Sequence, residues 1–221
     1  MTTYLITGCG RGIGLAITRA LLARGDRVIG SVRGGQAPVS HPNFKQLTFD
    51  VRDEAAVKTA ADDVDEAIDV VINNAGIMGP RTDSALEMDF DGFADVLAIN
   101  VLGPLRVTHA FLPHLRRANA SKTMAISSQL GSMSYPGSDR IAYRTSKAAL
   151  NKMMQGVALD LAKEGIAVVV VHPGWVRTDM GGASGDLEVT ESATGLIGVL
   201  DALTIETSGR FLNWDGTERP W

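Results

Sequence analysis

The sequence predicts one α/β domain built on a doubly wound, seven-stranded parallel sheet with helices on both faces. Short apolar runs rich in β-branched residues alternate with longer stretches of helical period, which is the pattern of successive βαβ units. The run Val168–Val171 is apolar at every position, as expected of a central strand that helices cover on both sides. No internal repeat or Pro/Ser-rich linker divides the 221 residues, so a single domain over residues 1–221 is expected.

The apolar runs place the seven strands in chain order. They are expected at Tyr4–Thr7, Arg27–Val32, Phe44–Phe49, Asp69–Asn73, Thr123–Ser127, Ala167–His172 and Arg210–Asn213. Helices are expected at Gly12–Arg24, Asp53–Glu66, Phe90–Arg117 with a break near Gly103-Pro104, Ile141–Glu164 and Thr190–Leu203. Between the second and third strands only Gly34–Asn43 remains, and its Gly-Gly pair and two prolines predict a loop in place of a helix.

Charge and length argue against several classes of protein. With 21 Lys+Arg against 25 Asp+Glu the net charge is −4, so the basic footprint of a nucleic-acid-binding protein is missing. The longest uncharged run, Thr123–Ser138, has 16 residues and falls short of the roughly 18 that a membrane span needs. The first residues do not read as a signal peptide, and Cys9, the only cysteine, cannot form an internal disulfide. The expectation is a cytoplasmic protein that binds neither nucleic acid nor membrane.

A glycine-rich turn follows the first expected strand. Gly8, Gly12 and Gly14 lead from that strand into a helix, which is the geometry in which backbone N–H groups and the helix dipole receive a pyrophosphate. The spacing is not G-x-G-x-x-G, and a turn that merely joins strand to helix is the alternative.

Two arginines stand where a dinucleotide fold holds the adenosine ribose. Arg11 lies inside the glycine turn and Arg33 follows the second strand, where an NAD enzyme usually carries an acidic residue for the ribose 2′-OH. Two guanidiniums there would suit a 2′-phosphate, so NADP(H) is expected in preference to NAD(H). Each arginine taken alone is equally compatible with a solvated surface charge.

Tyr143 and Lys147 lie at i and i+4 of an expected helix and therefore share one face. An ammonium beside a phenol favours the phenolate, so the pKa of Tyr143 is expected to fall from about 10 towards neutral pH. Ser128 follows the fifth strand at the carboxyl edge of the sheet, where its hydroxyl could bond a substrate carbonyl. Taken singly, the pair could be a helix-surface contact and the serine an ordinary loop residue.

Taken together, these motifs resemble the short-chain dehydrogenase/reductase family, of the compact type, which has a Rossmann fold. The matching elements stand in the family's order and cover nearly the whole chain: Thr7-Gly8-x-x-x-Gly12-x-Gly14, Asn73-Asn74-Ala75-Gly76, Asn100, Ser128, Tyr143-x-x-x-Lys147 and Pro173-Gly174. The C-terminal run from Gly209 to Trp221, together with Trp175–Gly182, resembles the C-factor and sniffer-like carbonyl reductase branch.

The resemblance implies a role for each matching residue. Tyr143 would be the general acid/base, Lys147 would lower its pKa and bond the nicotinamide ribose, Ser128 would orient the carbonyl, and Asn100 would hold a water of a proton relay. Cofactor contacts would come from Gly8, Arg11, Gly12, Ile13, Gly14, Arg33, Asp50, Val51, Asn74, Ala75, Gly76, Tyr143, Lys147, Pro173, Val176 and Thr178.

The implied activity is NADP(H)-dependent reduction of an aldehyde or ketone to an alcohol, or the reverse, by a homodimer or homotetramer. No metal is expected, because the four histidines show no ligand spacing. The short segment from Met180 to Glu188 predicts an open site of low substrate discrimination, and Met78, Met133 and Met180 could line it. Alternatives are a non-catalytic NADP(H) sensor, a signalling protein of the C-factor kind and a sugar-nucleotide epimerase, the last disfavoured by glycine spacing and length.

Overall fold

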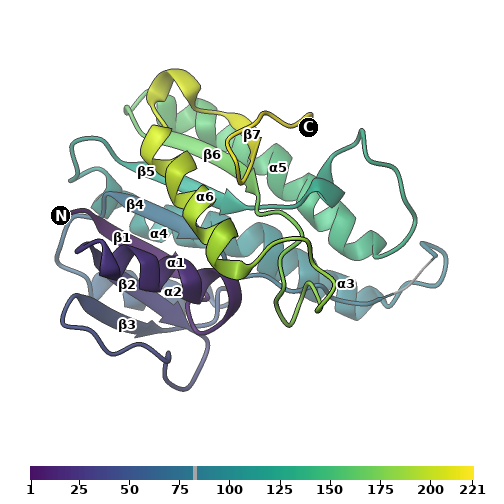
Figure 1. Cartoon of the computed structure of the whole chain (residues 1–221), viewed down its shortest axis with the longest axis horizontal. Coiled ribbons are helices and arrows are strands. Elements are labelled where there is room, and N and C mark those ends of the chain that lie inside the picture. The colour runs from purple at the N-terminus through teal and green to yellow at the C-terminus, as the bar shows by residue number, and fades with distance from the viewer. Residues whose placement is uncertain (82–83) are drawn as a thin grey trace.

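The seven strands form one parallel sheet in the order β3-β2-β1-β4-β5-β6-β7 (Figure 1). The computed structural model describes residues 1–81 and 84–221. The strands are β1 (Thr3–Thr7), β2 (Arg27–Val32), β3 (Phe44–Thr48), β4 (Val70–Asn73), β5 (Lys122–Ile126), β6 (Ala167–His172) and β7 (Arg210–Asn213). The chain builds outward from β1 to β3 and then returns to β4 on the other side of β1. This reversal is the point at which open α/β sheets bind their ligands.

Helices cover both faces of the sheet, as the sequence predicts. Figure 1 shows α1 (Gly12–Ala23) and α6 (Val189–Ala202) in front of it, and α2 (Glu54–Asp62), α4 (Gly103–Leu115) and α5 (Ile141–Ala162) behind. Alternate strand residues enter the two layers of core. Val168 and Val170 pack on the α4 and α5 side, whereas Val169 and Val171 pack on the α1 and α6 side. The apolar run in β6 is therefore confirmed as a strand buried on both faces.

The connection between β2 and β3 contains no helix, which confirms the loop expected there. The side chain of Gln46, in β3, holds this loop. Its Oε1 accepts from the backbone N–H of Ala37 at 2.8 Å and its Nε2 donates to the carbonyl of Gly35 at 3.0 Å. One strand side chain thus satisfies backbone groups that a crossover helix would otherwise pair internally.

The long helix expected over residues 90–117 is not broken at Gly103-Pro104, and that expectation is wrong. α3 (Phe90–Leu97) passes through a π-helical turn, Ala98–Leu102, directly into α4. Pro104 is the second residue of α4, and because it has no N–H it cannot donate to a carbonyl of the preceding π-turn. The disturbance lies one turn earlier than expected, around Asn100, and π-turns of this kind are frequent at functional sites.

This same helix, Phe90–Leu115, is long and apolar enough to cross a membrane by length and composition alone. Asp91, Asp95 and Arg106 interrupt its apolar sequence, so it does not contain a long uncharged run. Its residues Val107, Phe111 and Leu115 are fully buried in the core. A core helix meets the same criterion, so this one carries no membrane assignment.

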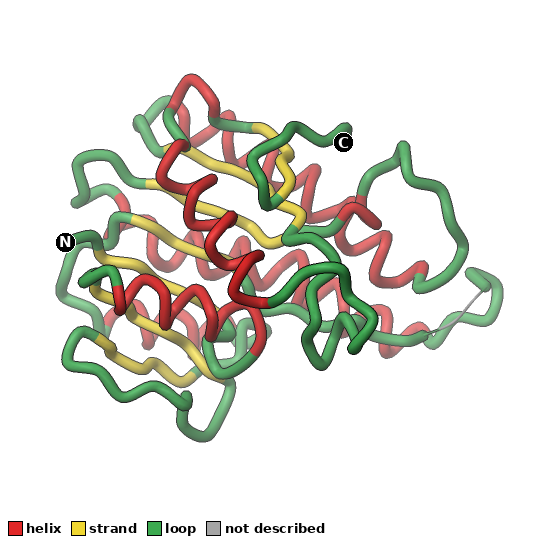
Figure 2. Tube along the Cα trace, in the orientation of Figure 1, coloured by secondary structure: helices red, strands yellow, loops and turns green. Residues whose placement is uncertain are grey.

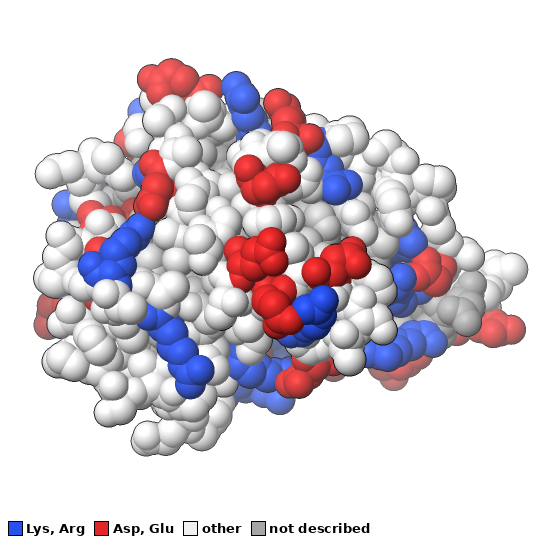
Figure 3. All heavy atoms as spheres, in the orientation of Figure 1, with Lys and Arg blue, Asp and Glu red and all other residues white. Residues whose placement is uncertain are grey.

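Long loops follow β4, β5 and β6 at the carboxyl edge of the sheet (Figure 2). On the face drawn in Figure 3, acidic and basic side chains are interspersed.

Candidate functional site

A cleft of about 640 Å³ opens at the carboxyl edge, where the strand order reverses. Most residues that the sequence assigned to a cofactor line it: Gly8, Arg11, Gly12, Ile13, Arg33, Asp50, Val51, Asn74, Ala75, Gly76, Tyr143, Lys147, Pro173 and Thr178. The other assigned residues are not among the lining: Gly14, Asn100, Ser128 and Val176.

The glycine turn is packed against the turn that follows β4. The Thr7 hydroxyl accepts from the backbone N–H groups of Asn74 and Ala75, both at 3.0 Å. Asn74 Nδ2 donates back to the carbonyls of Thr7 at 2.9 Å and Gly8 at 3.1 Å. Gly8 has a left-handed φ of 72°, and a Cβ at Gly14 would come within 2.4 Å of Asn74 Nδ2 and of the Gly8 carbonyl oxygen. Only glycine fits these two places.

The first turn of α1 faces this cleft with no side chain capping it. Its leading backbone N–H groups therefore have no intrahelical partner, and the helix dipole adds positive potential there. Bare backbone, open N–H groups and a cleft of this size fit the pyrophosphate of a dinucleotide.

The two arginines expected to converge on a 2′-phosphate are engaged differently. Arg11 Nη1 lies 3.0 Å from Asp179 Oδ2, and both side chains are largely exposed at the mouth of the cleft. Arg33 lines the cleft and makes no ion pair with any residue that the structure describes. Of the two guanidiniums, Arg33 is thus the one not engaged by a carboxylate.

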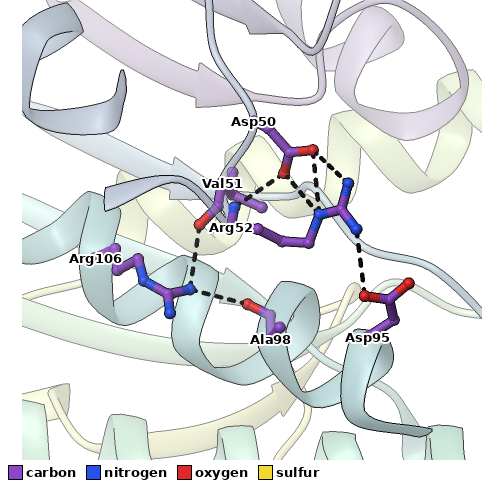
Figure 4. A network of polar contacts seen from close by, with 6 residues as sticks. All are labelled: Asp50, Val51, Arg52, Asp95, Ala98 and Arg106. Atoms are coloured by element: carbon purple, nitrogen blue, oxygen red, sulfur yellow. Dashed lines mark hydrogen bonds and ion pairs between the residues drawn. The ribbon is translucent and has the colours of Figure 1, made fainter. Parts of the chain in front are cut away.

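The turn after β3 is fixed by a network of polar contacts (Figure 4). Arg52 bonds the carboxylate of Asp50, with its Nη2 at 2.8 Å from Oδ2, and reaches Asp95 on α3 at 3.2 Å. The Arg52 hydrogen bond is the main cause that holds the pKa of Asp50 below its usual value, and the charge of Arg33 adds to it. Asp50 therefore stays ionised beside the cleft.

Arg106 joins this turn to the π-turn. Its Nη1 donates to the carbonyl of Ala98 at 3.2 Å and to that of Val51 at 3.4 Å (Figure 4). Gly103 packs closely on the same residue, since a Cβ there would come within 2.9 Å of Val51 Cγ2. The π-turn and the cleft wall at Val51 are thereby held in one arrangement.

Tyr143 and Lys147 line the cleft and are buried, with exposed fractions of 8% and 5%, whereas Ser128 is 7% exposed and is not among the lining residues. Tyr143 and Lys147 stand one turn apart at the start of α5, and Lys147 Nζ is 5.5 Å from the Tyr143 ring centroid. Nζ also donates to the carbonyl of Ile126 at 2.9 Å. The Ser128 hydroxyl accepts from the backbone N–H of Leu130 at 3.2 Å, at the start of the 3₁₀ turn Gln129–Gly131.

The expected fall of the Tyr143 pKa is wrong for this site. Burial raises the pKa of Tyr143 to about 12. A hydrogen bond with Ser128 and the charge of Arg140 lower this pKa, but by less than burial raises it. Burial also lowers the pKa of Lys147 to about 8. The low-dielectric surroundings thus favour the neutral form of both groups, and at pH 7 the phenol is protonated while the ammonium is still charged.

Asn100 lies in the π-turn and is fully buried. Its Oδ1 accepts from the backbone N–H of Ile77 at 2.9 Å, and its Nδ2 donates to the Ile77 carbonyl at 2.9 Å and to Ser146 Oγ at 3.0 Å. Ser146 in turn donates to the carbonyl of Tyr143 at 2.7 Å. Asn100 therefore links the loop after β4 to the helix that carries the tyrosine.

The segment after β6 closes one side of the cleft. Val176 is buried and pairs with Leu187, while the Thr178 hydroxyl accepts from the backbone N–H of Gly181 at 3.1 Å. Met180 lines the cleft, as expected, but Met78 and Met133 are not among the lining residues, and Met133 is 84% exposed.

Several residues of the site were not assigned from the sequence. Asp179 is one, although it directly follows the assigned Thr178, and Ser127 and Ile77 also line the cleft. The sequence signal that could have identified these residues is their position next to an assigned motif. Within residues 1–81 and 84–221, no three His, Cys, Asp or Glu side chains lie close enough together to hold a metal ion.

Comparisons with known proteins agree with this geometry. The family model described as short chain dehydrogenase matches residues 2–188. The C-signal of Myxococcus xanthus is 43% identical over 155 residues, which cover 70% of this chain and 93% of the relative.

Two solved structures share the fold over the whole chain. The carbonyl reductase Sniffer of D. melanogaster has a TM-score of 0.94 at 32% identity, with 100% of both chains covered. An NADPH-bound carbonyl reductase from chicken fatty liver has a TM-score of 0.92 at 33% identity, covering 100% of this chain and 99% of its own. This chain therefore belongs to the short-chain dehydrogenase/reductase family, of the compact type, near the branch of C-signal and the Sniffer carbonyl reductase.

Proposed function

We propose that this protein is an NADP(H)-dependent oxidoreductase that interconverts an aldehyde or ketone and its alcohol, with Tyr143 as general acid/base. The observation that carries the proposal is the buried Tyr143, which lines the cleft with Lys147 and is hydrogen-bonded with Ser128, while an uncapped helix start faces the same cleft. The proposal places this chemistry in one catalytic domain over residues 1–221.

NADPH, when bound, supplies the hydride that reduces the carbonyl carbon. The hydroxyls of Ser128 and Tyr143 donate hydrogen bonds to the carbonyl oxygen and stabilise the charge that develops on it. Tyr143 then gives up its proton, for which it is in the correct state because its pKa is about 12. The charged Lys147 favours the phenolate that this transfer leaves, and Asn100 holds the helix turn between them in place.

The cofactor would lie with its pyrophosphate at the glycine turn and its adenosine near Asp50, Val51 and Arg33. The basic Arg33 in place of an acidic residue supports NADP(H) over NAD(H). The chicken carbonyl reductase, which is bound to NADPH, supports the same choice by similarity.

The cleft is proposed to accept many carbonyl compounds. The segment from Trp175 to Glu188 is folded on itself, through the pairing of Val176 with Leu187 and a bond from Trp175 Nε1 to the Gly181 carbonyl at 2.8 Å. So short a segment leaves little chain to enclose a substrate. A panel of aldehydes, quinones, diketones and cyclic ketones should therefore give kcat/KM values within a narrow range, and tight selectivity for one large substrate would contradict this.

The test of the reaction is NADPH oxidation with that panel, using wild type, Tyr143→Phe and Tyr135→Phe. Removing the phenol hydroxyl at residue 143 should lower kcat by about 10²–10⁴-fold, the usual contribution of a positioned acid. Tyr135 is the matched control, because its ring is 46% exposed in a neighbouring loop. A wild type that binds NADPH but reduces nothing would favour a non-catalytic sensor.

Cofactor choice is tested by Arg33→Asp, which should shift the NADPH/NADH preference towards NADH. Arg117→Asp makes the same change of charge beside Glu66, to whose carbonyl Arg117 donates at 2.9 Å, and should leave the ratio as it is. An unchanged NADPH/NADH ratio in Arg33→Asp would contradict the assignment of Arg33 to the 2′-phosphate site.

The similarity to C-signal favours a second candidate, a signalling protein. Expression of Tyr143→Phe in cells distinguishes the signalling function from the enzymatic one. A cellular effect that persists without the hydroxyl does not depend on the reaction. We also propose a cytoplasmic location. We further propose that the protein is a homodimer or homotetramer, and sedimentation of the purified protein measures this oligomeric state.

A further inference from the structure

The helix that carries Tyr143 and Lys147 presents a third polar residue on the same side. Asn151 follows Lys147 by one turn of α5, as Lys147 follows Tyr143, and it is 3% exposed. Its neighbours on the helix, Leu150 and Met154, belong to the apolar core. A buried amide among apolar side chains is costly unless it is hydrogen-bonded.

The bonds of Asn151 go to both sides of Ser128. The Ser127 hydroxyl donates to Asn151 Oδ1 at 2.6 Å, and Asn151 Nδ2 donates to the carbonyl of Gly131 at a longer 3.4 Å. Ser127 directly precedes Ser128, and Gly131 ends the 3₁₀ turn that Ser128 begins. One side chain therefore holds the short segment around Ser128 at two points.

The same segment lies directly on the α5 backbone. A Cβ at Gly131 would come within 2.6 Å of the Lys147 carbonyl carbon and 2.7 Å of Lys147 Cβ. These are backbone and near-backbone atoms that cannot give way. The glycine thus permits the close contact, and the Asn151 bonds fix where along α5 it is made.

We propose that Asn151 is a positioning residue, which sets the Ser128 hydroxyl relative to the Tyr143 hydroxyl by holding Ser127 and Gly131 on α5. The proton donor, its lysine and the anchor for the second hydroxyl would then share one rigid element. The inference rests on the proposed carbonyl reduction and adds to it a residue that touches neither substrate nor cofactor.

The experiment is a double-mutant cycle on kcat with Asn151→Ala, Ser127→Ala and the double variant. A displacement of about 1 Å at a reacting group can cost 10²-fold, so each single variant should lose about 10- to 100-fold in kcat. The double variant should lose little more than either single one, since both remove the same anchor. The dissociation constant of NADPH should change less than about two-fold in Asn151→Ala, because Asn151 itself does not line the cleft.

Met154→Ala is the matched control. It removes a fully buried side chain one turn along the same helix and should lower the thermal midpoint without the loss of kcat, when assayed below that midpoint. A kcat for Asn151→Ala within two-fold of wild type, or losses that multiply in the double variant, would overturn the proposal.

A crystal structure of Asn151→Ala provides a readout that does not depend on activity, and it should show the Ser128 hydroxyl moved away from Tyr143. An unmoved Ser128 would overturn the proposal by itself. If Tyr143→Phe is as active as wild type, the proposed function fails, and the position of Ser128 still decides the role of Asn151. If Tyr143→Phe is inactive while Asn151→Ala matches wild type, only the positioning role fails.

Discussion

At the scale of single residues, burial sets the chemistry of the site more than the pairing of charges does. Tyr143 and Lys147 are adjacent, yet burial moves the pKa of the phenol up to about 12 and that of the ammonium down to about 8. A protonated phenol beside a charged lysine is the arrangement that carbonyl reduction requires at neutral pH. Alcohol oxidation requires the opposite state of the tyrosine.

The two directions of the reaction should therefore differ in pH dependence. The rate of reduction should fall as pH rises through about 8, since Lys147 then loses the charge that stabilises the Tyr143 phenolate left by proton transfer. Oxidation should keep rising with pH up to 10, since the fraction of phenolate grows while pH stays below the Tyr143 pKa of about 12. Rate profiles in both directions check this. A plateau in the oxidation rate below pH 8 is the contrary outcome.

Asp179 is expected to weaken cofactor binding, because it occupies Arg11 at the mouth of the cleft. Asp179→Asn should tighten the binding of NADPH by about two- to five-fold, as exposed ion pairs are worth about 0.2–1 kcal/mol. Asp186→Asn, an exposed residue of the same loop, is the control. Calorimetric titration at low and at high salt measures the effect, and weaker binding in Asp179→Asn would show that Asp179 helps to hold the cofactor instead.

At the scale of elements, the π-turn depends on contacts from outside its own five residues. Arg106 bonds the Ala98 carbonyl, and Asn100 bonds Ile77 and Ser146 on two other segments. The sequence of residues 98–102 does not indicate these partners, so it did not predict the π-turn. It predicted a break near Gly103-Pro104, because glycine and proline are local signals. The loop between β2 and β3 was predictable because Gly34-Gly35 and the two prolines act locally.

Removing the Arg106 guanidinium should expose this dependence. Arg106→Leu leaves the Ala98 and Val51 carbonyls without the donor and should lower the free energy of unfolding by about 1–3 kcal/mol. The control is Arg116→Leu, which breaks an exposed pair with Glu164 and should cost clearly less stability than Arg106→Leu. Urea unfolding of both variants makes the comparison. Equal losses would mean that the π-turn needs no support from Arg106.

The sequence predicted some features of the candidate site and not others, because only features that depend on local sequence can be predicted from it. Glycines, the Tyr143/Lys147 spacing and the strand ends are local features, and the structure brings most of them to one cleft. The pairing of Arg11 with Asp179 joins residues 168 positions apart, and the raised pKa of Tyr143 depends on burial by several segments. Both follow from tertiary structure, which spacing alone does not encode.

At the scale of the whole molecule, one sheet with two core layers places every loop of the site at its carboxyl edge. The same burial creates a pH-sensitive point at the end of β6. Burial lowers the pKa of His172 to about 4, and the charge of Arg219 lowers it further. Its Nδ1 is buried without a hydrogen-bond partner among the described residues.

Stability should therefore fall in mild acid. The native pKa of about 4 lies below the unfolded value of 6.5, so the unfolded chain binds the extra proton between these values. The contribution is complete above pH 6.5 and is lost towards pH 4, by about 3 kcal/mol over that interval. Urea unfolding at pH 7.0 and 4.5 should show a clearly smaller loss in His172→Leu than in wild type. Equal losses would assign the acid sensitivity to other groups.

The transfer of deuterium from NADPH labelled at C4 tests the central claim most directly. Wild type, given a carbonyl substrate and each of the two C4-labelled forms, should place deuterium on the carbinol carbon from one form only, as read by mass spectrometry of the alcohol. Tyr143→Phe should form this product about 10²–10⁴-fold more slowly, while Tyr135→Phe matches wild type. NADPH consumption without a deuterated alcohol, or equal product formation by Tyr143→Phe, would contradict the account.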